Sequence, residues 1–211
     1  MDQGLKGALS LAGQDACQRY YQSWADSYDS GFAREMEYRL PAHVAAAFLG
    51  AGGSGPVLDV GAGTGLLAER LREMGFDGEI DAADFSAKML ARAAEKRLYA
   101  GLYRADITQP LALPRRYGGI VSSGTFTSGH VGPEALPHLL DMALPGALVA
   151  LSINRRVWTS VGFDRALEQL TAEARIADLR LPEVEVYGAA ATALDADHAG
   201  DRALVALFSV V

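Results

Sequence analysis

The sequence predicts an α/β fold with a mainly parallel sheet and helices on both of its faces. Three observations predict it: short apolar runs alternate with stretches of helical periodicity, glycines and prolines separate them regularly, and one run leads into a glycine-rich turn. Parallel strands need crossover connections, and right-handed helical crossovers cover both faces of such a sheet. We therefore expect ligands to bind at the carboxyl ends of the strands.

The predicted elements follow one another in a β-α-β-α order. Residues 57–60 (VLDV) form the first strand, and leucines then recur at helical spacing until Gly75 ends the helix. Residues 79–84 form the second strand, and Ser86 caps the next helix. The expected inner face of that helix consists of Met89, Leu90, Ala93 and Ala94. Further strands are expected at 102–107, 118–123 and 147–153, with a helix over 133–142.

Two segments fall outside this alternation. We expect residues 1–56 to form an N-terminal helical cap or lid and residues 57–211 to form the main domain. Residues 155–182 are expected to be an inserted helical segment, which is the second candidate for a lid. Two closing strands are expected at 183–189 and 202–211.

Composition narrows the range of functions. The 211 residues contain 19 Lys and Arg against 26 Asp and Glu, and the net charge of −7 disfavours a broad basic surface for nucleic acid. The single cysteine, Cys17, indicates no disulfide framework and favours a reducing cytoplasm. We expect neither a signal peptide nor a membrane span. The histidines have no metal-ligand spacing, so we expect no metal site.

The most informative segment runs from Asp59 to Gly65 (DVGAGTG), between the first strand and its helix. Glycines let the backbone approach a ligand closely, and the helix N-terminus behind them presents N–H groups, so the pattern favours a nucleotide-like ligand. Leu66 stands where the dinucleotide fingerprint requires glycine or alanine. The Lys-Ser/Thr ending of a phosphate-binding loop is also missing, which argues against an ATPase or GTPase.

Acidic residues at the next two strand ends strengthen this interpretation. Asp84 follows Gly65 by 19 residues and stands where a carboxylate accepts both hydroxyls of a ribose, with Asp81 as a competitor for that role. Phe85 is placed to cover an adenine, and Asp106 is placed to accept from its amino group. Asp59 either caps the glycine turn or holds an ammonium group of the ligand.

At this point the chain resembles the class I S-adenosylmethionine-dependent methyltransferases. The resemblance rests on VLDVGAGTGLLAERL (57–71), IDAADFSAKMLARAAEK (80–96) and YRADITQPL (103–111), and it covers roughly residues 20–211. The segment 20–29 is similar to the ubiquinone/menaquinone-biosynthesis-like branch, and most closely to the Williams–Beuren-region methyltransferase group. The resemblance implies a Rossmann-like, seven-stranded, mostly parallel sheet whose last strand is antiparallel.

The resemblance also implies a cofactor, S-adenosylmethionine, and a set of residues that contact it. Gly61, Gly63 and Gly65 would lie against it, Asp84 would hold its ribose, and Phe85 with Asp106 would hold its adenine. Tyr20, Trp24 and Tyr28 would cap its methionine end, although a stripe at this spacing also fits ordinary core packing. The expected set is completed by Asp59, Ala62, Ser86, Met89, Ala105, Ile107 and Ser122.

The acceptor side is less defined by the sequence. His130 follows a hydroxyl-rich stretch after the fourth strand and is a candidate general base, with an ordinary surface loop histidine as the alternative. We expect methyl transfer to a small molecule, without nucleic acid or membrane as partner. A non-catalytic cofactor-binding module and a nicotinamide-dinucleotide oxidoreductase remain as alternatives, and the oligomeric state is left open.

Overall fold

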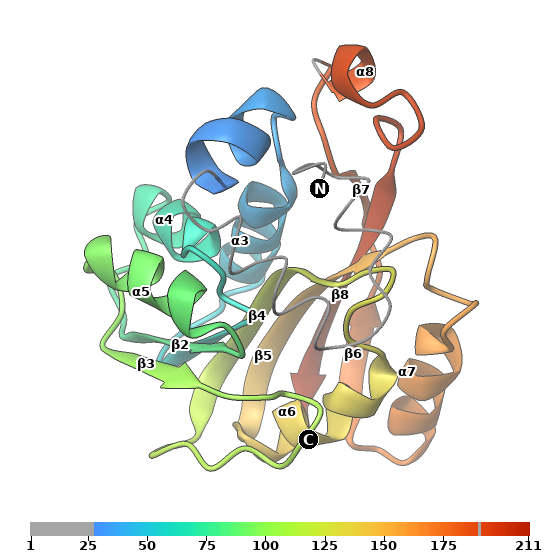
Figure 1. Cartoon of the computed structure of the whole chain (residues 1–211). Coiled ribbons are helices and arrows are strands. Elements are labelled where there is room, and N and C mark those ends of the chain that lie inside the picture. Colours follow the sequence, from blue (N-terminus) through green and yellow to red (C-terminus); the bar gives the residue numbers. More distant parts are fainter. Residues whose placement is uncertain (1–27, 190) are drawn as a thin grey trace.

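The computed structural model describes residues 28–189 and 191–211. One sheet of eight strands runs through the centre of the molecule (Figure 1), and its central strands are formed by short apolar runs. The strands are β1 Val57–Val60, β2 Ile80–Asp84, β3 Gly101–Arg104, β4 Tyr117–Phe126, β5 Ala143–Asn154, β6 Ile176–Arg180, β7 Glu183–Glu185 and β8 Arg202–Val210.

The sheet is mostly parallel. Its order is β3-β2-β1-β4-β5-β8-β6, and β7 pairs with β8 off this path. The first five strands in this order are parallel, with Val57 opposite both Ile80 and Gly119, whereas β8 runs antiparallel to β5. The predicted sheet with an antiparallel last strand is therefore confirmed, with β7 as an eighth strand.

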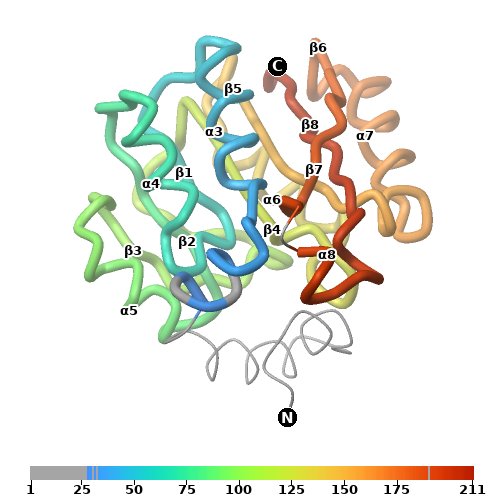
Figure 2. The backbone as a smooth tube through the Cα atoms, turned by 90° about the horizontal axis from the view of Figure 1, so that it is seen from above, coloured from blue at the N-terminus to red at the C-terminus, as the bar shows by residue number. Residues whose placement is uncertain are grey.

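Helices cover both faces of the sheet. They are the π-helix η1 Tyr28–Ala33, α3 Leu40–Gly50, α4 Leu66–Glu73, α5 Ala87–Glu95, the 3-10 turn η2 Pro133–Ala135, α6 Leu136–Asp141, α7 Phe163–Ala172 and α8 Ala191–Leu194. The helices α3, α4 and α5 lie against one face, and α6 and α7 lie against the other (Figures 1 and 2). The two faces bury separate apolar clusters, one around Phe48 and Leu71 and the other around Phe126 and Phe163.

The helix after β2 follows the expected pattern with one exception. The side chain of Ser86 accepts a hydrogen bond from the Met89 amide at 3.3 Å, so it caps α5 as predicted. Met89, Leu90 and Ala93 are buried, but Ala94 is exposed, and the expectation for that residue is wrong. The buried face of this short helix is a narrow stripe, and Ala94 lies beyond its edge.

The two segments outside the alternation differ from a simple lid. In residues 155–182, the helix α7 packs into the core and β6 pairs with β8, so this segment extends the sheet and is not a helical insertion. In residues 1–56, the described helix α3 belongs to the core layer, where Val44, Ala45 and Phe48 have no exposed surface. None of the helices in the described part of the chain combines the length and apolarity that a membrane crossing requires.

Candidate cofactor and acceptor site

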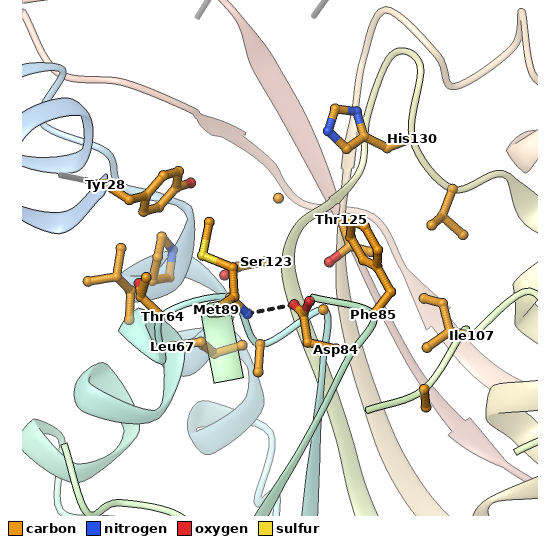
Figure 3. A pocket seen from close by; sticks show the side chains of 18 of the residues that line it. Tyr28, Thr64, Leu67, Asp84, Phe85, Met89, Ile107, Ser123, Thr125 and His130 are labelled. Carbon is orange, nitrogen blue, oxygen red and sulfur yellow. Dashed lines mark hydrogen bonds between the residues drawn. The ribbon is translucent and has the colours of Figure 1, made fainter. Parts of the chain in front are cut away.

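A cavity of about 310 Å³ lies at the carboxyl ends of β1, β2 and β4 (Figure 3). The glycine-loop half consists of Gly61, Ala62, Gly63, Thr64, Leu66, Leu67, Asp84, Phe85, Met89, Ala105, Asp106, Ile107 and Thr108. The β4-loop half consists of Ser123, Gly124, Thr125, Gly129, His130, Val131 and Glu134. Tyr28, Tyr38 and Pro41 complete the wall from the N-terminal side.

The glycine loop needs glycine for two physical reasons. Gly61, Gly63 and Gly65 have φ of +63°, +56° and +91°, a region that disfavours residues with a side chain. A Cβ on Gly61 would also lie 2.0 Å from Oγ1 of Thr125, whereas a Cβ on Gly63 would meet nothing within 4 Å. The backbone at Gly63 is therefore open to the cavity, and the backbone at Gly61 is packed tightly against β4.

Asp84 holds the glycine loop to the end of β2. Its Oδ2 accepts a hydrogen bond from the Gly63 amide at 2.9 Å (Figure 3), and its Oδ1 accepts one from the Ser86 amide at 2.7 Å. Burial raises the pKa of Asp84 to about 6, and the two amide hydrogen bonds partly oppose this shift. A carboxylate offers about four acceptor positions, so two of them are left for a ligand.

Two other acids, Asp59 as a candidate for the glycine turn or an ammonium group and Asp81 as the competitor for the ribose, do not line the cavity. Asp59 is buried behind the glycine loop, where it accepts a hydrogen bond from the Tyr99 hydroxyl at 2.7 Å. Burial raises the pKa of Asp59 to about 7, the bond from Tyr99 lowers it, and nearby Asp84 raises it further. Asp81 accepts hydrogen bonds from Tyr117 and Arg115, both at 2.9 Å, and does not line the cavity. The geometry therefore favours Asp84 over Asp81.

The third strand end also reaches the cavity. Asp106 lines it and accepts hydrogen bonds at one carboxylate oxygen from both the amide and the hydroxyl of Thr108, at 3.0 and 2.7 Å. These two bonds fix the carboxylate in a short turn at the cavity wall. Phe85 lies on the same side, with Ile107 next to it in Figure 3.

The β4-loop half brings hydroxyl groups and an imidazole to the cavity. Ser122 is buried behind the lining, where its hydroxyl donates to the Val60 carbonyl at 2.7 Å and lies 2.9 Å from Oγ1 of Thr125. Nδ1 of His130 lies 2.8 Å from the Ser128 carbonyl. Because a carbonyl only accepts, this nitrogen carries the proton and the lone pair is on Nε2. Burial lowers the pKa of His130, although the Ser128 carbonyl partly opposes the shift.

The structure brings most of the expected contact residues to one place. Ten of the predicted cofactor residues line the cavity: Tyr28, Gly61, Ala62, Gly63, Asp84, Phe85, Met89, Ala105, Asp106 and Ile107. His130 lines it from the opposite side (Figure 3). Asp59, Gly65, Ser86 and Ser122 stand behind the lining and support it. Tyr20 and Trp24 lie outside the described residues.

Several lining residues were not anticipated from the sequence. Thr64 belongs to the glycine motif itself, and Ser123 and Thr125 belong to the hydroxyl-rich stretch that begins at the end of β4, so both groups had a visible signal. Tyr38 and Pro41 had none, because Tyr38 reaches the cavity from the connection before α3 and Pro41 from the first turn of α3. In the described ranges, no three His, Cys, Asp or Glu side chains are grouped so that they could hold a metal ion.

Comparisons with known proteins agree with this architecture. Residues 57–146 match the family model described as "Methyltransferase domain". The chain is 33% identical over 155 residues to methyltransferase-like protein 27 from Homo sapiens, an alignment that covers 71% of this chain. The chain spans 62% of the length of that relative.

Two solved structures share the fold at low sequence identity. One is magnesium protoporphyrin IX methyltransferase from Synechocystis PCC 6803 with bound SAH, which has a TM-score of 0.63, 16% identity and coverage of 94% of this chain and 100% of that chain. The other is the N-methyltransferase NodS from Bradyrhizobium japonicum WM9 in complex with S-adenosyl-L-homocysteine, with a TM-score of 0.56, 17% identity and coverage of 81% and 85%. The chain therefore has the Rossmann-like methyltransferase fold, and residues 57–146 carry the sequence pattern of a methyltransferase domain.

Proposed function

We propose that the protein is an S-adenosylmethionine-dependent methyltransferase that acts on a small molecule. The observation that carries this proposal is the cavity at the carboxyl ends of β1, β2 and β4, where an open glycine backbone faces a buried carboxylate at the tip of β2. The methyltransferase pattern over residues 57–146 supports it, as does the fold shared with two structures that contain the demethylated cofactor.

The glycine-loop half fits the cofactor in its chemistry. The bare backbone at Gly63 admits a ligand, and Asp84 has acceptor positions for the two ribose hydroxyls. Phe85 and Ile107 offer apolar surface for the adenine, and Asp106 offers a carboxylate for its amino group. We assign the methionine end of the cofactor to the wall that contains Tyr28.

The β4-loop half is assigned to the methyl acceptor. S-adenosylmethionine supplies an already activated methyl group on its sulfonium, so the protein has to align the nucleophile, exclude water and, where necessary, take up a proton. We propose that His130 takes up that proton at Nε2. Its lowered pKa keeps the imidazole neutral, and therefore able to accept a proton, at neutral pH.

The size and charge of the cavity support a small acceptor. A volume of about 310 Å³ lies at the lower end of the range of roughly 300–1,000 Å³ for small-molecule sites. Among the described lining residues there are three carboxylates, Asp84, Asp106 and Glu134, and no lysine or arginine. Such a wall is poorly suited to the phosphates of a nucleic acid. The cytoplasmic location and the two branches expected from residues 20–29 remain predictions.

A labelling experiment tests this proposal. The purified protein is incubated with S-adenosylmethionine carrying a labelled methyl group and with an extract separated into small-molecule, protein and nucleic-acid fractions. We expect label in the small-molecule fraction, and less of it with the Asp84→Ala variant when the cofactor is not saturating. Label in protein or nucleic acid would contradict the assigned acceptor class. Tight binding of S-adenosylhomocysteine without any transfer would favour a non-catalytic cofactor-binding module.

A further inference from the structure

One carboxylate links the N-terminal segment to the glycine loop. Oδ1 of Asp29, in η1, accepts a hydrogen bond from the Thr64 hydroxyl at 2.5 Å. Oδ2 of Asp29 lies 2.6 Å from Nζ of Lys96, the residue that follows α5. Both carboxylate oxygens of Asp29 therefore contact the glycine-loop half of the site, through residues that are far from η1 in the sequence.

Lys96 is shared between two carboxylates. Its Nζ also lies 3.0 Å from Oε2 of Glu69 on α4, so the ammonium group stands between Asp29 and Glu69. Its aliphatic chain packs by the glycine loop, with Cδ 3.6 Å from the position of a Cβ on Gly65. We call these four residues, Asp29, Thr64, Glu69 and Lys96, the Asp29 bridge.

The residue next to Asp29 lies in the cavity wall. Tyr28 lines the cavity on the same side as Thr64, across from His130 (Figure 3). Since Tyr28 and Asp29 are adjacent in η1, holding the carboxylate of Asp29 against Thr64 also fixes where the Tyr28 ring can stand. The bridge is partly accessible to solvent, with 35% of the Asp29 side chain and 18% of the Lys96 side chain exposed.

We propose that Asp29 is a positioning residue that seats Tyr28 against the bound cofactor through this bridge. The inference rests on the proposed function, because it takes the glycine-loop half as the cofactor site. An ion pair with this degree of exposure is screened by salt. Retention of S-adenosylhomocysteine should therefore weaken as salt is raised, even though this ligand has no net charge of its own at neutral pH.

The charge arrangement ranks the variants that test the bridge. Asp29→Asn removes the ion pair but keeps an oxygen that can accept from Thr64, so its effect should be moderate. Lys96→Met leaves Asp29 and Glu69 facing each other without the cation that both contact, so its effect should be larger. In the double variant Asp29→Asn with Lys96→Met this repulsion is relieved, and binding should recover relative to Lys96→Met alone.

The matched control is Glu73→Gln. Glu73 is an exposed acid on the same helix as Glu69, and it pairs with Arg70 instead of Lys96. It changes the net charge by the same amount as Asp29→Asn without touching the bridge. Thermal unfolding of each variant shows whether the fold itself is preserved.

Two measurements on the full-length protein decide the proposal. Hydrogen exchange without ligand should be faster at residues 28–33 in Asp29→Asn, but not in Glu73→Gln. The Kd for S-adenosylhomocysteine should rise about two- to fivefold in Asp29→Asn through faster dissociation, with most of its salt dependence lost. Exchange and affinity equal to those of Glu73→Gln would overturn the proposal. If the unmodified protein does not bind S-adenosylhomocysteine, the proposed function is contradicted. Hydrogen exchange at residues 28–33 that is unchanged in Asp29→Asn contradicts the role of the Asp29 bridge independently of that result.

Discussion

The two halves of the cavity are constructed in different ways. The glycine-loop half is formed mainly by backbone. Three glycines in it have positive φ, and the amides of Gly63 and Ser86 both donate to the carboxylate of Asp84. In the β4-loop half the wall consists of residues from the end of β4, the connection that follows it and the short turn η2, with Thr125, His130 and Glu134 as one example of each.

This difference explains why the sequence predicts the cofactor but not the methyl acceptor. Backbone geometry with positive φ constrains residue type strongly, so a site made from it leaves a motif of fixed spacing. A loop that presents side chains accepts many sequences with the same fold, so its ligand is not encoded in a general pattern. We therefore expect substitutions in the two halves to separate binding of the cofactor from turnover.

The largest effect is expected at His130, and it tests whether the β4-loop half is catalytic. His130→Gln should lower methyl transfer by about a hundredfold to ten-thousandfold if the imidazole is the general base, with little change in the Kd of S-adenosylhomocysteine. Since burial lowers the pKa of His130, activity of the unmodified protein should fall only when the pH drops below its ordinary value of 6.5. Equal loss of turnover and of cofactor affinity would show that the two halves do not act separately.

The next largest effect is expected in the glycine loop. Gly61→Ala should weaken binding of S-adenosylhomocysteine by about a hundredfold, because the new Cβ is strained at φ of +63° and collides with Thr125. The matched control is Gly75→Ala, at φ of +91° with nothing within 4 Å of the new Cβ and away from the cavity. Calorimetry should find normal affinity for this control, and equal losses in both variants would point to a general loss of folding.

A smaller effect is expected at Asp84. Asp84→Ala should weaken binding of S-adenosylhomocysteine by about 1–3 kcal/mol, as expected for lost hydrogen bonds to a charged group. Asp81→Asn serves as the comparison, because Asp81 is bonded to Tyr117 and Arg115 outside the cavity. Its substitution should lower thermal stability while leaving the calorimetric Kd near normal. A Kd that responds to Asp81 and not to Asp84 would reverse the assignment.

The last expected effect is on folding stability and not on ligand binding or turnover, and it concerns the support behind the glycine loop. The pKa of Asp59 is about 7 in the folded chain, above its ordinary value of 3.8. Between about pH 4 and pH 7, Asp59 therefore keeps its proton in the folded state and has lost it in the unfolded state. Stability should therefore decrease as pH rises from about 4 to 7, by at most about 1.4 kcal/mol per pH unit. Denaturant unfolding of Asp59→Asn should show a flatter dependence. If the stability of both proteins depends on pH in the same way, Asp59 is not the source of this pH dependence.

Much of the fold follows from local patterns, and the exceptions have physical causes. The strands β1, β2, β4 and β5 are apolar runs next to glycines or helix stop signals, so they are visible in the sequence. The strand β6 is not, because its residues alternate between buried and exposed at a sheet edge and follow α7 without a clear break. The segment at 155–182 was therefore expected to be a helical insertion, although its last part, β6, belongs to the sheet.

The candidate site also contains residues that local patterns predict and residues that they do not. Asp84 could be anticipated from its distance to Gly65, because the strand and the turn fix where its carboxylate lies. The place of Asp59 could not, since its buried position depends on Tyr99, a residue 40 positions later. Tyr38 and Pro41 were also missed, because only the tertiary arrangement of the start of α3 and the connection before it brings them to the cavity.

The most direct test of the central claim is calorimetric titration of the purified protein with S-adenosylhomocysteine, run beside NAD under the same conditions. The glycine-loop geometry predicts micromolar binding of S-adenosylhomocysteine, weakened about a hundredfold in Gly61→Ala and less in Asp84→Ala, with no binding of NAD. Binding of NAD without S-adenosylhomocysteine would contradict the assignment of the cavity and favour a dinucleotide-dependent oxidoreductase instead.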